Sequence, residues 1–282
     1  GSMDHNLFIY MPSGFAYPMA NPRYAWLYES EPEPFMDNRR IHCPRGKVIG
    51  GSSSINGMVY IRGHALDYEG WASRFGLPDW TYAHCLPYFR KSETRAKGGD
   101  DYRGDSGPLH VSTGACNNPL YNAFIEAGQQ AGYARTDDMN GQRQEGFGPM
   151  DMTVHKGRRW STAMAYLRPA LKRPNLVLRT SALTTRVLFE GSESPRAVGV
   201  EVVHHGVRMQ MRATREVILC GGAINSPQLL QLSGVGNPAL LEPLGIPVVA
   251  ARKGVGENLQ DHLDTYVQYA CKEPITLYSA VS

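Results

Sequence analysis

Three glycine-containing segments of the sequence carry residues suited to chemistry. The first, residues 46–57 (GKVIGGSSSING), sets paired glycines before three serines. Such a loop exposes consecutive backbone N–H groups, which can bind an anion or let the backbone approach a flat cofactor. It has neither the G-x-G-x-x-G spacing of a dinucleotide loop nor the Lys-Ser/Thr ending of a P-loop. Taken alone, such a segment is more often a plain turn.

The second and third segments lie in the other half of the chain. Residues 217–227 predict a buried strand that turns through Gly221 and Gly222 into a helix, whose N-terminus could present amides to a phosphate. Close packing of strand and helix explains the same residues at least as well. Residues 254–264 are dense in side chains that hold or move protons, His262 among them. A lone histidine is more often a satisfied core group, so we expect His262 to be structural.

The composition indicates an ordinary globular chain. Its 282 residues suffice for one large domain or two average ones, at roughly 150 residues per domain. Hydrophobic residues make up 42% and charged residues 20%, which excludes a disordered or fibrous chain. The net charge is only +3, and the basic residues are scattered, with residues 156–159 as the longest cluster. We therefore expect no nucleic-acid partner.

Cysteine usage and hydropathy bear on the location of the protein. The number of cysteines is odd and no CxxC pair occurs, which argues against a zinc site or a disulfide framework and favours a reducing compartment. We expect no bound metal, and we expect buried thiols at Cys43, Cys85, Cys116, Cys220 and Cys271. No apolar run approaches the ~18 residues of a membrane-spanning helix. The expected location is cytoplasmic, with peripheral attachment to the inner face of a membrane left open.

The elements that would position these segments can be predicted from periodicity and turn residues. Proline punctuation over residues 7–45 predicts an extended covering segment with little helix. Apolar spacing predicts a pair of short helices within residues 67–92. Further expected elements are a strand at 109–111, helices at 119–131 and 161–171, and loops at 98–107 and 137–149.

After residue 175 the pattern changes to short β-branched runs. They predict an antiparallel meander and a final buried strand, over residues 176–179, 184–189, 197–203, 207–213 and 217–220. A helix is expected next, at residues 226–232, with Pro227 at its first position. Strands mixed with helices predict an α/β fold class of mixed α+β character.

Taken together and in this order, the three segments resemble the glucose-methanol-choline (GMC) family of FAD-dependent oxidoreductases. The resemblance runs from about Met11 to the last residue and includes both family signatures, GKVIGGSSSIN and GGAINSPQLLQLSGVG. Within the family, the segments ESEPEP, YIRGHALDYEGWA, LPYFRKSE, MNGQRQEGFGPMDMT and GVGENLQDH are most similar to choline dehydrogenases. The resemblance implies oxidation of choline to betaine aldehyde, the first step of glycine betaine synthesis.

The resemblance also implies a division of the chain. Residues 1–3 look like the scar of an expression tag. Residues 4–113 would form the flavin loop and covering segment of the FAD-binding region, and residues 114–175 a helical and loop part. Residues 176–282 would hold the meander, the strand-turn-helix and the start of the substrate domain.

Two regions of a typical family member have no counterpart in this sequence. Family members begin with a Rossmann strand and a G-x-G-x-x-G loop, and they end with the segment that carries the catalytic histidine. The resemblance therefore implies a central fragment with no catalytic residue of its own, which alone would bind little or no FAD. In the full-length protein FAD would be held without a covalent bond, because Ile55 stands where choline oxidase has a histidine attached to the flavin.

Site residues follow from the same resemblance. Val48, Asn56, Gly57, Met58 and Val59 fall where family members bring backbone and side chains against the flavin. Thr184 falls where many members place a residue whose backbone meets the adenine, although valine is common there.

The substrate site would have to hold a trimethylammonium group. Such a group has no N–H to donate, so only a carboxylate and aromatic faces can bind it, each face contributing ~0.5 to 2 kcal/mol. Asp264 lies two residues after His262, where choline-oxidising relatives have a glutamate. Phe15 and Tyr17 are candidate walls of an aromatic cage. Aromatic residues in a proline-rich loop are as often there only to pack against their neighbours.

The sequence is compatible with two other interpretations of the function. The full-length protein could oxidise another primary alcohol, because Asp264 is one methylene shorter than the expected glutamate. The fragment could also be a catalytically silent scaffold without a ligand. The expected partners are an alcohol, which is choline in the first reading, and an electron acceptor.

Overall fold

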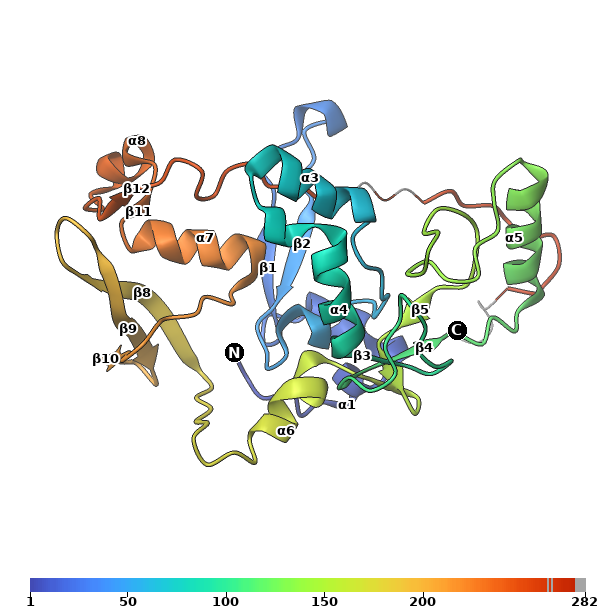
Figure 1. The fold of residues 1–282 in the computed structure, drawn as a ribbon, viewed down its shortest axis with the longest axis horizontal. Helices are drawn as coiled ribbons and strands as arrows, with labels where there is room; N and C mark the ends of the chain where they lie inside the picture. Colours follow the sequence, from blue (N-terminus) through green and yellow to red (C-terminus); the bar gives the residue numbers. More distant parts are fainter. Residues whose placement is uncertain (263, 265, 277–282) are drawn as a thin grey trace. The chain divides into compact units, whose positions relative to one another are not determined.

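The computed structural model describes residues 1–262, 264 and 266–276. The chain divides into two compact units, and Figure 1 traces both by colour. The first, called the loop unit because it holds residues 46–57, comprises Ser2–Leu178 with Tyr269–Ser282. The second, the meander unit, comprises Arg179–Gln268 with Gly1.

The loop unit is built from short strands and helices. Its strands pair as β1 with β2, β3 with β4, β4 with β5 and β6 with β7, and only the β3–β4 pair is parallel among those described. In chain order its elements are α1 (Leu7–Tyr10), η1 (Pro12–Gly14), α2 (Ala16–Ala20), β1 (Ala25–Glu29), η2 (Pro34–Met36), β2 (His42–Gly46), η3 (Gly51–Ser54), α3 (Ala65–Phe75), η4 (Pro78–Trp80), α4 (Tyr82–Ser92), β3 (Glu93–Arg95), β4 (Leu109–Thr113), α5 (Pro119–Gln130), β5 (Asp151–Met152), β6 (Val154–His155), β7 (Arg158–Arg159), η5 (Ala163–Leu167) and α6 (Arg168–Ala170).

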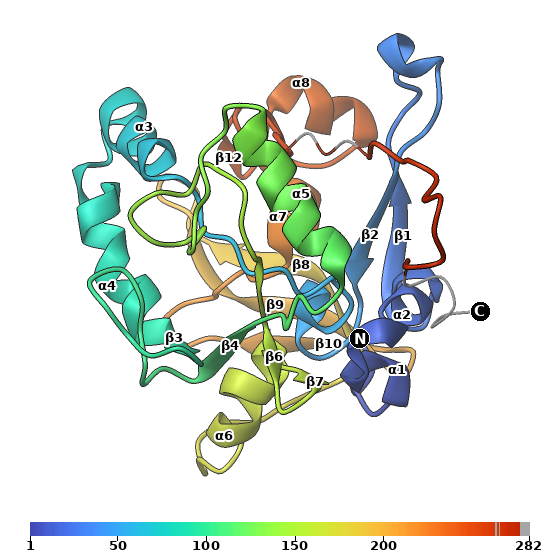
Figure 2. The same ribbon diagram turned by 90° about the vertical axis from the view of Figure 1, so that its right-hand side faces the viewer.

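Residues 7–45 contain more regular structure than their prolines predict. The Asn6 side chain caps α1, and β1 pairs with β2 in an antiparallel hairpin whose register runs from Ala25 opposite Gly46 to Glu29 opposite His42. Figure 2 shows this hairpin beside α1 and α2. The expectation of a merely extended segment is thus wrong. A proline interrupts only the helical turn in which it stands, so helices of four and five residues can still form between prolines. Prolines also do not prevent residues 25–29 from pairing with residues 42–46.

The predicted pair of helices within residues 67–92 is confirmed as α3 and α4. His64 and Asp67 form a reciprocal cap at the start of α3, and Gly76 ends it in the left-handed region with φ of 65°. Thr81 caps α4. The Tyr68 ring joins the two helices, with its centroid 5.7 Å from that of Phe89.

The remaining predictions for the loop unit are confirmed. Strand β4, helix α5 and the helical turns η5 and α6 occupy the expected ranges, and residues 98–107 and 137–149 form loops. Gly128 of α5 packs so closely on Phe147 that a Cβ there would lie 2.5 Å from the ring. That contact holds the loop against the helix.

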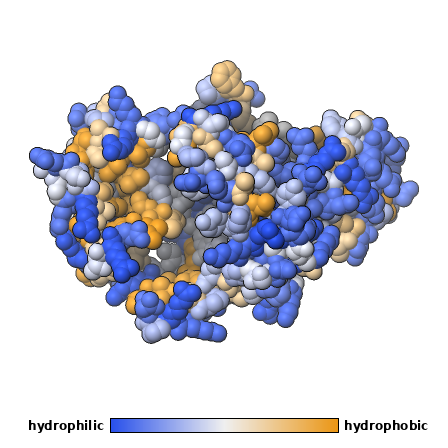
Figure 3. Space-filling view, viewed as in Figure 1, coloured by the Kyte–Doolittle hydropathy of each residue, from blue (hydrophilic) through white to orange (hydrophobic). Residues whose placement is uncertain are grey.

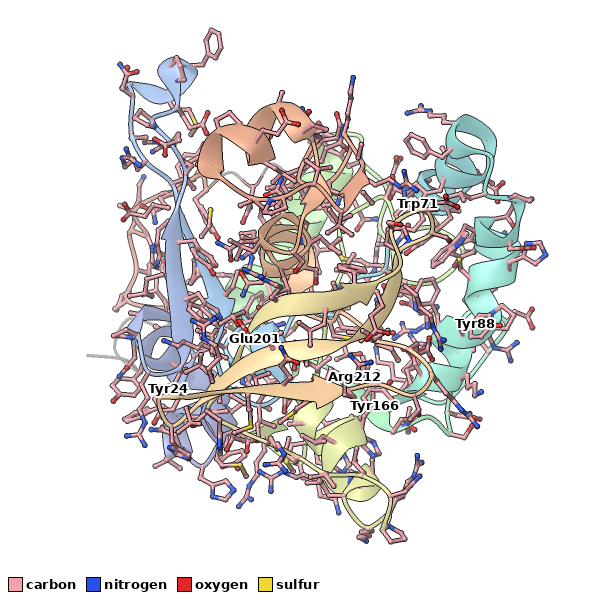
Figure 4. The ribbon with its side chains drawn as sticks, turned by 90° about the vertical axis from the view of Figure 1, so that its left-hand side faces the viewer. Tyr24, Trp71, Tyr88, Tyr166, Glu201 and Arg212 are labelled. Carbon is pink, nitrogen blue, oxygen red and sulfur yellow. The ribbon has the colours of Figure 1, made fainter. Side chains whose placement is uncertain are left out.

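The meander unit contains the predicted antiparallel sheet, in the strand order β10-β9-β8. Helix α7 packs on β8, and the Ser233 hydroxyl after the helix accepts a hydrogen bond from the Val187 backbone N–H at 2.8 Å. On the exposed side Arg208 binds Glu201 and Arg212 binds Glu190, and Figure 4 labels Glu201 and Arg212 on their strands. The elements of this unit are β8 (Ala182–Glu190), β9 (Arg196–His204), β10 (Val207–Arg212), α7 (Gly222–Leu232), β11 (Val235–Gly236), α8 (Pro238–Leu241), η6 (Glu242–Leu244) and β12 (Ala250–Ala251).

Apolar side chains gather around α7 (Figure 3). Between α7 and α8 they line a groove of about 450 Å³, with Leu232, Leu240 and Leu244 among its walls. The helix itself begins at Gly222, four residues before the predicted start, so Pro227 lies inside it and not at its first position. The missing proline N–H costs α7 one internal hydrogen bond.

Two predicted strands do not form. Residues 176–179 and 217–220 pair with no other strand among the described residues, and Val177 and Ile218 are 74% and 73% exposed. The prediction of a final buried strand is therefore wrong. β-branched composition favours an extended backbone, but a strand also needs a partner for its N–H and C=O groups. The mixed α+β class itself is confirmed.

The five cysteines are free thiols. Cys43, Cys85 and Cys116 are partly buried, whereas Cys220 and Cys271 are exposed, so the expectation of buried thiols is wrong. Cys220 is exposed because the strand that would have buried it is unpaired. In the described residues no group of three potential ligands could hold a metal ion. No helix of that same part of the chain has the length and apolarity needed to cross a membrane.

Candidate functional site

The glycine-serine loop, residues 46–57, folds back tightly on itself after β2. A Cβ on Gly46 would lie 2.1 Å from the carbonyl carbon of Gly51, so only glycine permits this approach. Gly50 adopts a φ of 86°, and a Cβ there would lie 2.3 Å from the Ser54 hydroxyl. Gly46 and Gly50 are therefore required by the loop's own shape.

The hydroxyls of the three serines make hydrogen bonds that hold the loop closed. The Ser52 hydroxyl accepts from the Gly46 N–H, and the Ser54 hydroxyl donates to the Ile49 carbonyl at 2.7 Å. Ser53 donates to the Gly50 carbonyl at 2.6 Å and accepts from the Thr162 N–H. Because these hydroxyls and several backbone N–H groups are used internally, the loop is poorly suited to bind an anion.

The far end of the loop is open. Asn56 and Gly57 are exposed, Val59 is 48% exposed, and a Cβ built on Gly57 would meet nothing within 4 Å. Met58 is buried and takes the left-handed conformation with φ of 65°, which turns the chain sharply after Gly57. Gly57 therefore presents accessible backbone beside free space, between the exposed residues Asn56 and Val59. A flat group such as a flavin ring could approach there.

Arg159 of β7 supports the loop from the buried side. Its guanidinium donates to the Ile9 carbonyl at 2.8 Å, to the Ser53 carbonyl at 3.1 Å and to the Asn56 side-chain oxygen at 2.8 Å. The side chain is 1% exposed, and burial lowers its pKa to about 10. The guanidinium thus joins α1, the loop and β7 while remaining charged at neutral pH.

A buried ion network supports the strand-like segment that leaves the loop. Glu93 accepts from Arg62 at 2.6 Å and from Arg103 at 2.9 Å, and Arg103 also binds Asp151 at 2.8 Å and Asp138. Burial alone would lower the pKa of Arg103, but its hydrogen bonds to Glu93 and Asp151 outweigh burial and raise it. The network fixes residues 60–62, directly after the exposed end of the loop.

The structure places the predicted flavin-facing residues in two environments. Val48 lies in a buried cluster with Ile9, Tyr24, Ala25 and Ile55, so its side chain packs inward. Asn56, Gly57 and Val59 form the open end, and the buried Met58 lies between them. Of the predicted set, Thr184 belongs to the meander unit, where it lies on β8 opposite Val202.

The candidate substrate residues lie on exposed or half-buried surface. Phe15 is half-buried, and the 47% exposed ring of Tyr17 contacts Phe8 with centroids 4.7 Å apart. Asp264 is exposed and accepts a hydrogen bond from the Tyr266 hydroxyl, which raises the pKa of Tyr266. His262 is exposed as well, so the expectation of a core histidine is wrong.

Comparison with known proteins shows the family to which the chain belongs. The sequence profile of the GMC oxidoreductases matches residues 8–264. The chain belongs to the GMC oxidoreductase family. The match covers both compact units of the chain.

Curated relatives of this GMC chain include choline dehydrogenases. It is 60% identical over 273 residues to the oxygen-dependent choline dehydrogenase of Chromohalobacter salexigens, covering 96% of this chain and 48% of that protein. It is 59% identical over 272 residues to the mitochondrial choline dehydrogenase of Mus musculus, covering 96% of this chain and 45% of that protein. The chain spans about half the length of the curated relatives it matches.

Solved structures of the family share the fold. Pyridoxine 4-oxidase from Mesorbium loti superposes with a TM-score of 0.83 at 32% identity, over 89% of this chain and 49% of that one. An FAD-dependent oxidoreductase from Chaetomium thermophilum gives a TM-score of 0.82 at 29% identity, over 90% of this chain and 45% of that one. The mixed α+β arrangement is therefore that of GMC proteins, which implies FAD as the cofactor of the family.

Sequence reasoning missed Arg159 as part of the GMC loop. It belongs to the basic cluster at residues 156–159, and such clusters are usually solvated. One signal is available in the sequence: successive side chains of a strand point to opposite faces, so one of two neighbouring arginines in a short hairpin faces inward. In β7, Arg158 is exposed and Arg159 is buried. Which of the two arginines faces inward depends on the strand register, which the sequence does not reveal.

Proposed function

We propose that the full-length protein is an FAD-dependent dehydrogenase that oxidises choline to betaine aldehyde, the first step of glycine betaine synthesis. The observation that carries this proposal is the 59–60% identity to choline dehydrogenases from a bacterium and from mouse over 96% of the chain. When bound, FAD accepts the hydride that leaves the alcohol carbon.

We propose that residues 48 and 56–59 hold the flavin and that the backbone at Thr184 meets the adenine. The open end of the loop supports this assignment, because Asn56 and Gly57 are exposed and Gly57 lies next to free space. The buried Val48 would act through its backbone and by supporting the loop from below. FAD is held without a covalent bond in this proposal, since Ile55 has no nucleophilic atom and is only 2% exposed.

We propose further that these 282 residues alone hold FAD weakly and do not oxidise alcohols. No G-x-G-x-x-G sequence occurs among them, and that motif places the pyrophosphate of a dinucleotide on a helix N-terminus. We assign no catalytic residue to them. In the domain division we propose, residues 4–113 belong to the FAD-binding region, 114–175 to a helical and loop part, and 176–282 to the meander and the start of the substrate domain.

For the substrate, we propose that Asp264 supplies the negative charge that attracts the quaternary ammonium group, with Phe15 and Tyr17 as aromatic walls. The carboxylate of Asp264 is exposed, which supports its role as a negative charge that a cation can approach. The partners are therefore choline and an electron acceptor. The free cysteines support a reducing, cytoplasmic location.

A second candidate is a GMC dehydrogenase for another primary alcohol. Two observations favour it: the shorter carboxylate at residue 264, and the similarity at TM-score 0.83 to a structure named for oxidation of pyridoxine. The test is the turnover of the full-length protein with an artificial electron acceptor. A kcat/KM for choline well above that for neutral primary alcohols supports the first proposal, and the reverse order supports the second.

A further inference from the structure

We propose that Arg159 is a positioning residue that fixes the Asn56 carboxamide with its oxygen inward and its NH2 group outward, so that the loop presents a hydrogen-bond donor to the cofactor. This inference rests on the proposed function, because it takes residues 56–59 as the flavin-facing end of the loop.

The orientation of the Asn56 amide follows from the groups around it. One of its terminal atoms lies 2.8 Å from an Arg159 Nη1 atom and 3.1 Å from the Met58 backbone nitrogen. Both neighbours are donors without acceptor capacity, so the atom between them has to be the oxygen. The Asn56 NH2 group then lies on the other side of a residue that is exposed. Among the described residues no acceptor takes a hydrogen bond from this NH2 group, so its two N–H donors are available to a ligand.

Arg159 is held rigidly enough to set this orientation. Besides Asn56 it binds the carbonyls of Ile9 and Ser53, which belong to α1 and to the loop itself. Its side chain is 1% exposed, so water does not compete for these bonds. The planar guanidinium presents its donors in a fixed fork, which a lysine ammonium does not reproduce.

The surroundings of Arg159 exclude an ordinary ion-pair role. Within the described residues no carboxylate pairs with it, and its buried Nη2 atom has no hydrogen-bond partner. Arg103, buried to the same degree, binds three carboxylates. A buried cation that binds only neutral oxygens gains little Coulomb energy. Two of those three oxygens belong to the loop, so the geometry points to control of the loop.

The decisive variant is Asn56→Asp in the full-length protein. Aspartate keeps an oxygen for Arg159 and for the Met58 N–H and adds a charge opposite the guanidinium, so the melting temperature should not fall. It removes the outward NH2 group, so we expect the dissociation constant of FAD, from fluorescence titration of the apoprotein, to rise roughly tenfold, in line with the loss of one buried hydrogen bond. An unchanged dissociation constant would overturn the inference.

Coupling to Asn56 separates positioning from simple support of the fold. Arg159→Lys should weaken FAD binding and shift the visible absorption of bound flavin, and adding it to Asn56→Ala should weaken binding no further than Asn56→Ala alone. Additive effects would mean that Arg159 does not act through Asn56. Arg168→Lys is the matched control, because Arg168 lies in the same unit and its side chain binds Asp4 and Tyr10 instead of a residue of the loop. It should leave both FAD readouts unchanged.

These outcomes also separate the inference from the proposed function. A wild-type full-length protein that binds no FAD would overturn both. A wild-type protein that binds FAD, together with an Asn56→Asp variant that binds it equally well, would overturn the inference alone.

Discussion

Buried arginines occur in this protein in two opposite electrostatic settings. Arg103 binds Glu93, Asp138 and Asp151, so its charge is compensated several times over. Arg159 binds neutral oxygens only, and burial lowers its pKa to about 10. The first arrangement holds elements together, whereas the second orients one side chain of the loop. Burial alone therefore does not indicate the role of a charged residue.

At the residue scale, the proposed role of Asp264 makes a prediction for substrate binding. Asp264→Asn in the full-length protein keeps the shape and removes the charge. The KM for choline should therefore rise roughly 5- to 30-fold, which corresponds to about 1 to 2 kcal/mol. The neutral isostere 3,3-dimethylbutanol should be almost unaffected. Steady-state kinetics with both alcohols measure this, and equal effects on the two would assign Asp264 a structural role.

A second residue-scale prediction concerns His110 and pH. Burial lowers the pKa of His110, as do the charges of His155, stacked at 3.9 Å, and Lys156. Protonation is thus disfavoured in the folded state, so the contribution of His110 to stability is complete above pH ~6.5 and declines as the pH falls below it. His110→Asn should lose less stability between pH 7.5 and pH 5.5 than the wild type.

Urea unfolding at the two pH values measures that difference. His5→Asn is the control, because His5 is exposed, and it should follow the wild type. A His110→Asn variant with the same pH dependence as the wild type would show that this histidine does not drive the decline.

At the scale of elements, a segment with strand-like composition becomes a strand only if another segment of the chain pairs with it. Residues 176–179 and 217–220 have the composition of strands but pair with none among the described residues. Residues 25–29 and 42–46 lie in a proline-rich stretch and nevertheless form a regular hairpin. Strand propensity describes a preference of the backbone, whereas a strand exists only where a second one lies within hydrogen-bonding distance.

The ion network that joins several elements leads to a prediction for stability. Glu93 of β3 is fully buried and binds Arg62, Arg103 and the Gly104 N–H. Glu93→Gln leaves two buried cations without this charge, so the free energy of unfolding should fall by about 3 to 5 kcal/mol. Urea unfolding measures the change.

The control for this variant is Glu190→Gln, which breaks an ion pair whose side chains are 59% and 60% exposed. That change should cost less than about 1 kcal/mol. Equal losses in the two variants would mean that burial of the network contributes nothing to stability.

At the scale of the whole molecule, the fold is shared far more widely than the chemistry. The backbone superposes on pyridoxine 4-oxidase with a TM-score of 0.83, although only 32% of the residues are identical. A shared fold does not by itself transfer a substrate. The much higher identity to choline dehydrogenases, at 60%, is what supports choline over pyridoxine.

The absence of a nucleophile at Ile55 gives a prediction for the full-length protein. Precipitation with acid or heat should release FAD into the supernatant, because a non-covalent cofactor is lost when its site unfolds. Flavin absorbance of supernatant and pellet measures this, with a covalent flavoprotein as the control that keeps its colour in the pellet. Flavin that stays with the precipitate would contradict non-covalent binding.

The sequence by itself determined the family, the mixed fold class and the local elements that depend on neighbours in the chain. Helices α3, α4 and α5 begin at capping residues, and the meander follows short apolar runs separated by turns, so each could be predicted within its own window. The glycine-serine loop was recognisable for the same reason. Gly46 and Gly50 are needed because a Cβ on either would collide with another residue of the same loop, within residues 46–54.

The tertiary structure decided the hairpin β1–β2, the unpaired segments, the exposure of Cys220 and the burial of Arg159. The hairpin and the buried arginine exist because residues distant in sequence meet. The unpaired segments and the exposed cysteine exist because no such contact forms among the described residues. Arg159 meets Ile9 across 150 positions and Asn56 across 103. Local propensity acts over a few residues, whereas burial and compensation of charge depend on which distant segments meet. The support of the loop could therefore be seen only in three dimensions.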